Sequence, residues 1–198
     1  MRPKTSLRKL DSLLKRPSFT SKEANRFGVS TATLGHYVKQ GYLERLDRGV
    51  YRAPISPRVE DFRWEDLSET VYKVEGGVIC LTSALILYEL SEEMPREHWI
   101  AVSYRKTPKP RPHTKIVRMR NMKLGLGHIE LDGIKLPIFD RERTIVDAFR
   151  YLSIEIAIKA LKRGLTQKNG PRIDIKKVQE YAKEMRFNIT PYLVTLTT

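Results

Sequence analysis

The chain has 198 residues, of which 40% are hydrophobic and 30% charged, a composition that excludes a disordered or fibrous protein. Its formal net charge of +14 favours polyanionic partners, with nucleic acid ahead of an acidic membrane surface. The longest apolar run, residues 78–90, is too short to cross a bilayer, so we expect a core segment there and no membrane association.

Cysteine content and the start of the chain bear on the compartment. Cys80 is the single cysteine, which excludes an intrachain disulfide and a cysteine-rich zinc site. Its apolar neighbours predict a buried thiol. No secretory signal opens the sequence, so we expect a cytoplasmic protein.

Positive charge is concentrated in the first third of the chain. Residues 1–58 contain 13 Lys/Arg and 4 Asp/Glu, a net of +9, whereas residues 59–198 contain 24 and 19, a net of +5. Between the two parts, residues 53–64 contain two prolines and turn acidic, as a linker does. We therefore expect two domains, residues 1–56 and residues 57–198.

Three helices are predicted at the start of the chain. Apolar residues at three- and four-residue spacing predict an amphipathic helix over residues 5–16, which Pro17 stops. Thr20 and Glu23 form a capping-box pattern that begins a second helix ending at Gly28. A third helix follows the next turn.

The third helix is predicted to begin after the N-cap Ser30 and to end at Gly41. Leu34 and Val38 lie one turn apart on its expected buried face. Two short alternating strands joined at residues 47–49 then predict a β-hairpin. Helix, helix, turn, helix and hairpin is the order of a winged helix-turn-helix.

The exposed face of the third helix is a candidate for reading DNA bases. Short polar side chains allow close approach to base edges, and Gln can form a bidentate pair with adenine. The candidates on this helix are Thr31, Thr33, His36, Lys39 and Gln40. The alternative interpretation is an ordinary solvated helix face.

Cations on both sides of this helix are candidates for phosphate contacts. The hairpin contributes Arg45, Arg48 and Arg52, and the second helix contributes Lys22 and Arg26; ordinary surface cations are the alternative. Gly35 lies inside the third helix, where it costs about 1 kcal/mol relative to alanine. Close approach of the preceding helix or of a DNA backbone are the two explanations that the sequence leaves open.

The second domain is predicted to be mixed α/β, with helices segregated to its C-terminal side, which makes the whole chain α+β. Two helices are expected over residues 64–77 and 82–95, the second capped by Thr82. Strands over 97–104 and 115–121 and a hairpin over 128–139, turning at Asp132-Gly133, follow. Three amphipathic helices then start at Asp140, Ser153 and Asp174.

A second basic segment lies between Glu97 and Glu130, where no acidic residue occurs. It contains Arg105, Lys106, Lys109, Arg111, Lys115, Arg118, Arg120 and Lys123. Three prolines between residues 108 and 112 predict that its first half is a stiff, extended loop. A second nucleic-acid surface and a simple solvated loop are both compatible with this pattern.

No catalytic signature is visible. The sequence has no Walker-type loop, no nucleophile elbow and no histidine pair at metal spacing. Lys135 lies three residues beyond Asp132, the wrong spacing for a metal-dependent nuclease. Asp140 fits an N-cap, and Arg143 with Asp147 fits an i,i+4 ion pair. We expect no catalytic residue, cofactor or metal; the alternative is a nuclease or nucleotide-modifying enzyme delivered by a winged helix.

The sequence resembles the AbiEi family of antitoxins and transcriptional regulators of type IV toxin-antitoxin systems. Three segments carry the resemblance: residues 19–54, 81–102 and 136–151. Its more specific parts are "RGVY" in the hairpin and "ERT" followed by Asp in the later helix. Together with the segments between them, they extend over about residues 18–165.

The resemblance implies a function. It implies binding to inverted repeats in the protein's own promoter, repression of the operon, and a C-terminal part that counters a nucleotidyltransferase toxin without a stable complex. A monomer in solution with two copies on the DNA fits such repeats. The DNA role then falls on the candidates of the third helix and the hairpin, whereas Gly35 departs from the family pattern, in which a long side chain is expected.

Overall fold

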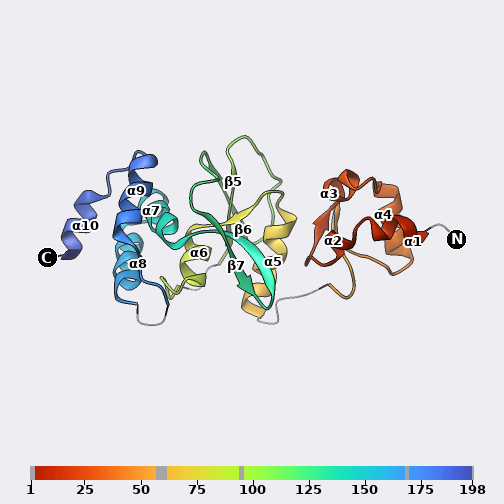
Figure 1. Ribbon diagram of the computed structural model, residues 1–198, viewed down its shortest axis with the longest axis horizontal. Helices are drawn as coiled ribbons and strands as arrows, with labels where there is room; N and C mark the ends of the chain where they lie inside the picture. Colours follow the sequence, from red (N-terminus) through yellow and green to blue (C-terminus); the bar gives the residue numbers. More distant parts are fainter. Residues whose placement is uncertain (1–2, 57–61, 94–95, 168–169, 198) are drawn as a thin grey trace. The chain divides into compact units, whose positions relative to one another are not determined.

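A computed structural model of the chain describes residues 3–56, 62–93, 96–167 and 170–197 (Figure 1). These residues form ten helices and eight strands, which confirms the α+β class. The chain divides into two compact units: Met1–Gly76 with Glu130–Leu136, and Gly77–Ile129 with Pro137–Thr198. The expected boundary at residue 57 lies outside the described residues and stays a prediction.

The first unit contains five helices and a three-stranded antiparallel sheet in the order β1-β3-β2. The helices are α1 Pro3–Arg8, α2 Asp11–Leu14, α3 Ser21–Arg26, α4 Thr31–Lys39 and α5 Phe62–Lys73. The strands are β1 Phe19–Thr20, β2 Glu44–Asp47 and β3 Val50–Arg52. The predicted hairpin is thus joined by a third strand, β1, which was not predicted.

The first predicted helix is wrong in one respect, because the chain forms two short helices, α1 and α2. At the break, the amide of Leu10 donates to Leu7 O at 2.9 Å, a bond three residues back rather than four. Leu10, between the two helices, is fully buried, Leu13 of α2 is 4% exposed, and Leu7 of α1 is partly buried against the same core.

Helix α3 begins as its capping box predicts. The Glu23 amide donates to Thr20 Oγ1 at 3.2 Å, and the Thr20 amide donates back to Glu23 Oε2 at 2.7 Å. Arg16 also donates to Glu23, at 2.8 Å. The core of the unit is apolar, formed mainly by Leu10, Phe19, Leu34, Tyr37, Leu43 and Tyr51.

The second unit contains most of a five-stranded mixed sheet in the order β6-β5-β4-β8-β7, in which the residues of β7 and β8 within Glu130–Leu136 are grouped with the first unit. Its strands are β4 Val78–Ile79, β5 His98–Ser103, β6 Thr114–Met119, β7 Leu126–Leu131 and β8 Ile134–Phe139. Its helices are α6 Leu81–Leu87, α7 Arg141–Tyr151, α8 Ile154–Thr166, α9 Ile175–Glu184 and α10 Thr190–Thr197. Strand β4 and helix α10 were not predicted.

The hairpin of β7 and β8 follows its turn chemistry. Asp132 and Gly133 have φ values of 47° and 77°, and this pair of left-handed residues is the type I′ arrangement that Asp-Gly favours. The predicted caps Asp140, Ser153 and Asp174 each accept a backbone amide at the start of their helix. Local signals therefore placed these elements correctly.

The predicted cap at Thr82 is wrong, because the N-cap of α6 is Cys80, two residues earlier. Strand pairing explains the shift: the Cys80 amide donates to Trp99 O at 3.1 Å, and the Trp99 amide donates to Ser83 Oγ at 2.9 Å. These bonds to β5 fix the end of β4 and hence the start of the helix. Cys80 is buried as predicted, and burial raises the pKa of its thiol well above the ordinary value.

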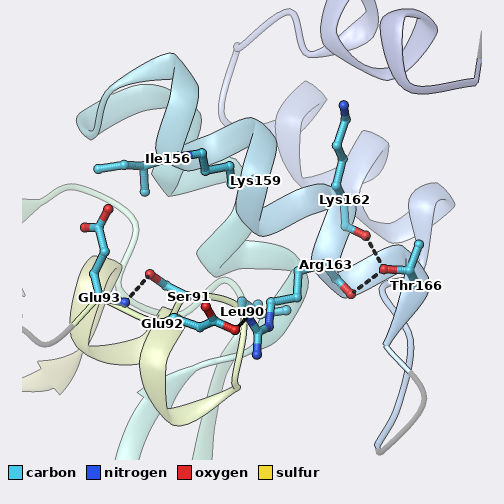
Figure 2. A pocket seen from close by; sticks show the side chains of 9 residues that line it. All are labelled: Leu90, Ser91, Glu92, Glu93, Ile156, Lys159, Lys162, Arg163 and Thr166. Atoms are coloured by element: carbon cyan, nitrogen blue, oxygen red, sulfur yellow. Dashed lines mark hydrogen bonds and ion pairs between the residues drawn. The ribbon is translucent and has the colours of Figure 1, made fainter.

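A cavity of about 590 Å³ lies beside the end of α6 and helix α8 (Figure 2). Arg163 forms an ion pair with Glu92 there, and Glu93 lies nearby on the same segment. The Lys162 side chain points away from these carboxylates (Figure 2).

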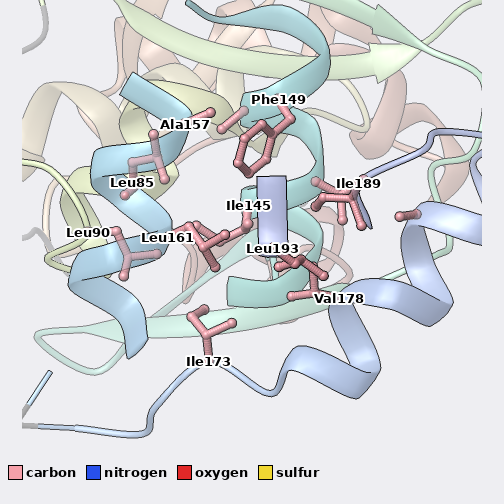
Figure 3. Close-up of a cluster of buried hydrophobic side chains, with 14 residues drawn as sticks. Leu85, Leu90, Ile145, Phe149, Ala157, Leu161, Ile173, Val178, Ile189 and Leu193 are labelled. Atoms are coloured by element: carbon pink, nitrogen blue, oxygen red, sulfur yellow. The ribbon is translucent and has the colours of Figure 1, made fainter. Parts of the chain in front are cut away.

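The main apolar core of the second unit lies among its helices (Figure 3). Helix α6 packs against both β5 and α7, and α7 contacts α8 and α9. Ile145 of α7, Leu161 of α8 and Val178 of α9 are completely buried in this cluster. Phe149 stacks on Tyr192 of α10, with ring centroids 4.9 Å apart. The unpredicted last helix is therefore held by aromatic contacts to α7.

Candidate nucleic-acid interface

Helix α4 is positioned by its cap and by two buried side chains. Ser30 Oγ accepts the Thr33 amide at 3.2 Å and lies 2.9 Å from the Thr33 hydroxyl. Leu34 and Tyr37 are buried with exposed fractions of 0% and 1%, whereas Val38, which was predicted to share the buried face with Leu34, is half-buried. The helix is thereby fixed on the core by one face.

The opposite face of α4 presents most of the predicted base-reading side chains to solvent. Thr31, His36, Lys39 and Gln40 are exposed, and Thr33 is half-buried beside the cap. His36, Lys39 and Gln40 lie on the side of α4 away from Leu34 and Tyr37, whereas Thr31 and Thr33, two residues apart, lie toward its two edges. Their role in reading bases stays a prediction.

Gly35 lies on the same helix, and its surroundings are open. A Cβ atom built at Gly35 meets no atom within 4 Å, apart from its chain neighbours and the adjacent helix backbone. Close approach of the preceding helix therefore does not explain this glycine. The other explanation that the sequence left open, approach of a DNA backbone, stays a prediction.

The β2–β3 hairpin carries two exposed cations, Arg45 in β2 and Arg48 in the turn. Gly49 has a φ of 77°, and its carbonyl accepts the Ser21 amide at 2.8 Å, which fixes the turn to the start of α3. Within the turn, the Arg45 Nε donates to Asp47 O at 3.3 Å. The side chains of Arg45 and Arg48 thus project from an anchored hairpin.

Arg52 differs from the other hairpin cations. Its side chain is 14% exposed, its Nε donates to Glu44 Oε2 at 2.6 Å, and its Nη1 donates to Glu69 Oε1 at 3.0 Å. Glu69 also accepts from Lys73 at 2.7 Å. The charge of Arg52 is therefore already balanced within the first unit, so its predicted phosphate contact requires these ion pairs to open.

Lys22 and Arg26 on α3 share one carboxylate. Both lie near Glu75, at 3.2 and 3.5 Å, and their side chains are 75% and 71% exposed. Ion pairs this exposed contribute little free energy, so the two cations can leave Glu75 for another anion at little cost. Lys22 and Arg26 consequently remain accessible to a phosphate.

The second basic segment does not form one continuous face. Lys115 and Arg118 are an odd number of residues apart in β6, so they point to opposite sides of the sheet. Six of the eight cations are exposed, whereas Lys106 and Arg111 are half-buried and engaged in contacts. The prediction of a second nucleic-acid surface over Arg105 to Lys123 stays a prediction.

The carboxylates near the start of α7 have structural partners. Asp140 Oδ1 accepts the Arg143 amide at 2.8 Å, and Glu142 accepts the Asp174 amide and the Lys177 ammonium at 3.2 and 3.0 Å. Burial lowers the pKa of Lys177, but hydrogen bonds to Asp140 and Glu142 raise it by more. Within the described ranges, no group of three or more His, Cys, Asp or Glu side chains is arranged to hold a metal ion.

The structure also brings together residues that the sequence left apart. Arg150 and Tyr151 of α7 and Arg186, which follows α9, border one cavity with Arg118 and Arg120. No spacing in the sequence connects these three positions to β6, because the sheet and the helical cluster assemble them. None of the three was predicted as a site residue.

Comparison with known families identifies the first part of the chain. Residues 8–54, well under half of the chain, match the family described as "Transcriptional regulator, AbiEi antitoxin". This match confirms the resemblance for that segment. No curated protein matches the chain. The described helices include none that is long and apolar enough to cross a membrane.

Proposed function

We propose, from the match of residues 8–54 to the AbiEi antitoxin regulators, that the chain is a DNA-binding transcriptional regulator whose first unit is a winged helix-turn-helix. The observation that carries the proposal is α4, a capped helix fixed on the core by Leu34 and Tyr37 with an exposed polar face. The β2–β3 hairpin beside it is the wing.

Helix α4 enters the major groove in this proposal. Gln40 suits adenine, and the methyl group of Thr31 suits the thymine methyl. Arg45 and Arg48 from the wing, with Lys22 and Arg26 from α3, neutralise phosphates on either side. Arg52 acts mainly by holding β3 to Glu44 and Glu69.

The proposed DNA target is the protein's own promoter. We propose that two copies, monomeric in solution, bind an inverted repeat there and repress transcription. Residues 57–198 counter a nucleotidyltransferase toxin of a type IV abortive-infection system against phage, without a stable complex. The family match supports this antitoxin and regulator role. A cytoplasmic, non-enzymatic protein fits it.

A footprinting experiment on the DNA upstream of the protein's own gene tests the proposed promoter binding. We expect an inverted repeat to be protected, with affinity that falls steeply as salt rises. The Arg45→Ala/Arg48→Ala variant loses two phosphate contacts, so the slope of log affinity against log salt falls by about 1.8. The matched control, Lys159→Ala/Lys162→Ala, removes two exposed cations of α8 and leaves the slope unchanged.

The same variant separates the two proposed activities. The Arg45→Ala/Arg48→Ala chain is expected to lose repression and still to relieve toxicity when expressed with the adjacent nucleotidyltransferase. Equal salt slopes for wild type, variant and control contradict the wing assignment. Metal-dependent turnover of DNA, RNA or nucleotides by the intact chain contradicts the non-enzymatic role.

A further inference from the structure

A cavity of about 420 Å³ in the second unit is lined by an unusual number of arginines. It lies where the end of β6, the end of α7 and the residues after α9 meet. Its rim residues come from these three places and from the segment after β5: Tyr104, Arg118, Arg120, Arg150, Tyr151 and Arg186. A volume of this size accommodates a small ligand.

The positive charge of this cavity is largely uncompensated. Arg118, Arg120 and Arg186 are exposed and form no ion pair with any described residue. Arg150 reaches Asp147 only at 3.5 Å, and its side chain is 30% exposed. The exposed carboxylate on the rim, Glu184, accepts from Asn121 at 3.0 Å.

Arg143 also lines the cavity, and its hydrogen-bonding groups already have partners. Its charge is matched by Asp147, and it donates to the carbonyls of Asn121 and Leu124, each at 3.0 Å. Four rim arginines against Glu184 therefore leave a local net charge of +3. Like charges converging on one concave surface repel each other, and a bound anion removes that repulsion.

Arg186 occupies a backbone position that normally favours glycine. It follows α9 with a φ of 53°, a left-handed conformation in which a side chain is strained. Its amide closes the helix by donating to Lys183 O at 3.0 Å. Arg186 thus lines the cavity from a backbone position at which glycine would be less strained.

Two exposed tyrosines complete the rim. Tyr104 is 47% exposed and Tyr151 is 43% exposed. The guanidinium of Arg150 lies over the Tyr151 ring, 5.3 Å from its centroid. Arginines bind phosphate through forked hydrogen bonds, and exposed aromatic rings stack on unpaired bases. We propose that this cavity binds a nucleoside phosphate, either free or at the end of a single strand.

The cavity beside α8 provides an internal comparison. It is larger, at about 590 Å³, but Glu92 and Glu93 offset two of its three cations, and no aromatic side chain lines it (Figure 2). Size alone therefore does not distinguish the arginine-lined cavity. Its charge and its tyrosines do.

Calorimetric titration of the full chain tests the proposal, with inorganic phosphate, ATP, UMP and a short 5′-phosphorylated single strand as probes. We expect saturable 1:1 binding of the nucleotides or of the strand, at least tenfold tighter than phosphate. Tighter binding of ATP or UMP identifies a free nucleotide as the ligand, and tighter binding of the strand identifies a strand end. Absence of saturable binding for all probes overturns the proposal, and binding of phosphate as tight as that of the nucleotides overturns the nucleoside part.

Three variants test whether the binding occurs in this cavity. Arg186→Gly removes a rim cation and relieves the strained backbone, so we expect at least tenfold weaker binding with an unchanged or raised melting temperature. Lys183→Ala removes one charge from α9 outside the cavity and is expected to bind normally. Tyr151→Ala is expected to weaken nucleotide binding and spare phosphate binding. Equal losses in Arg186→Gly and Lys183→Ala overturn the assignment to this cavity. Because no duplex DNA is used, the result is independent of the proposed promoter binding.

Discussion

The Nε of Arg143 donates a 2.8 Å hydrogen bond to Oδ2 of Asp147, one turn away on α7, and both side chains are 1% exposed. Asp147→Ala leaves the Arg143 charge buried without its partner, so we expect the free energy of unfolding to fall by about 3–5 kcal/mol. Arg150→Ala removes only the longer, more exposed contact to Asp147 and is expected to cost about 1 kcal/mol or less. Urea denaturation of both variants measures the difference, and equal losses contradict it.

The capping box of α3 gives the first unit a pH-dependent contribution to stability. Burial raises the pKa of Glu23, but hydrogen bonds from Thr20 and the charge of Arg16 lower it by more, so the folded pKa lies below the ordinary value. A lowered folded pKa stabilises the protein above the unfolded pKa of about 4.3, and the contribution is lost as the pH falls through the folded pKa.

Glu23→Ala is therefore expected to cost about 1 kcal/mol at pH 7 and much less near pH 3. Unfolding curves of wild type and variant at both pH values measure this. Glu180→Ala, at an exposed position of α9, serves as the control and is expected to show no such change with pH. If Glu23→Ala loses as much free energy of unfolding at pH 3 as at pH 7, the ionised capping box is ruled out as the cause of the loss.

Gly35 offers a test in which stability and DNA binding move in opposite directions. Gly35→Ala fills open space on α4, so we expect the free energy of unfolding to rise by about 1 kcal/mol. If a DNA backbone approaches this position, the added methyl group weakens binding to the upstream DNA. Thermal unfolding and gel-shift titration measure the two effects. Unchanged affinity in the stabilised variant excludes a close approach at Gly35.

Arg52 is expected to behave unlike the other hairpin arginines. Arg52→Ala breaks hydrogen bonds to Glu44 and Glu69, so we expect a loss of about 1–3 kcal/mol in the free energy of unfolding. The slope of log affinity against log salt stays as in the wild type, in contrast to Arg45→Ala/Arg48→Ala. A reduced slope for folded Arg52→Ala shows instead that Arg52 leaves its carboxylates to contact phosphate.

Gln40 is expected to contribute sequence preference. Gln40→Ala removes an amide that suits adenine, at a cost of about 1–3 kcal/mol of discrimination at one base pair. Selection from randomised half-sites measures the preference of both proteins. A uniform loss of affinity over all sequences indicates that Gln40 reads no base.

Elements with local signals were predictable from the sequence. Thr20, Ser30, Asp140, Ser153 and Asp174 accept amides at the helix starts that they were predicted to cap. The start of α6 was not predictable, because Trp99 in a distant strand determines it through Cys80 and Ser83. Strand β1 likewise exists only because Phe19 and Thr20 pair with β3, thirty residues later.

In the candidate interface, too, the features with a local signal were predictable and those set by tertiary contacts were not. The helix period indicated an exposed polar face of α4, but the structure buries Tyr37 beside Leu34 in place of the predicted Val38 and leaves Thr33 half-buried. The state of Arg52 depends on Glu69 of α5, and the arginine-lined cavity depends on residues from three elements. Contacts of this kind arise from tertiary packing, which no local spacing reveals.

The parallel pairing of β5 with β6 limits how short the chain between them can become. The two strands run side by side from His98–Thr114 to Ser103–Met119, so residues 104–113 must return the chain along the whole strand. Six strand residues span about 20 Å, and ten extended residues reach about 31 Å. Deletion of more than about three residues leaves too short a return. In this basic loop, the minimum length is therefore set by the sheet, independently of any ligand that its charges bind.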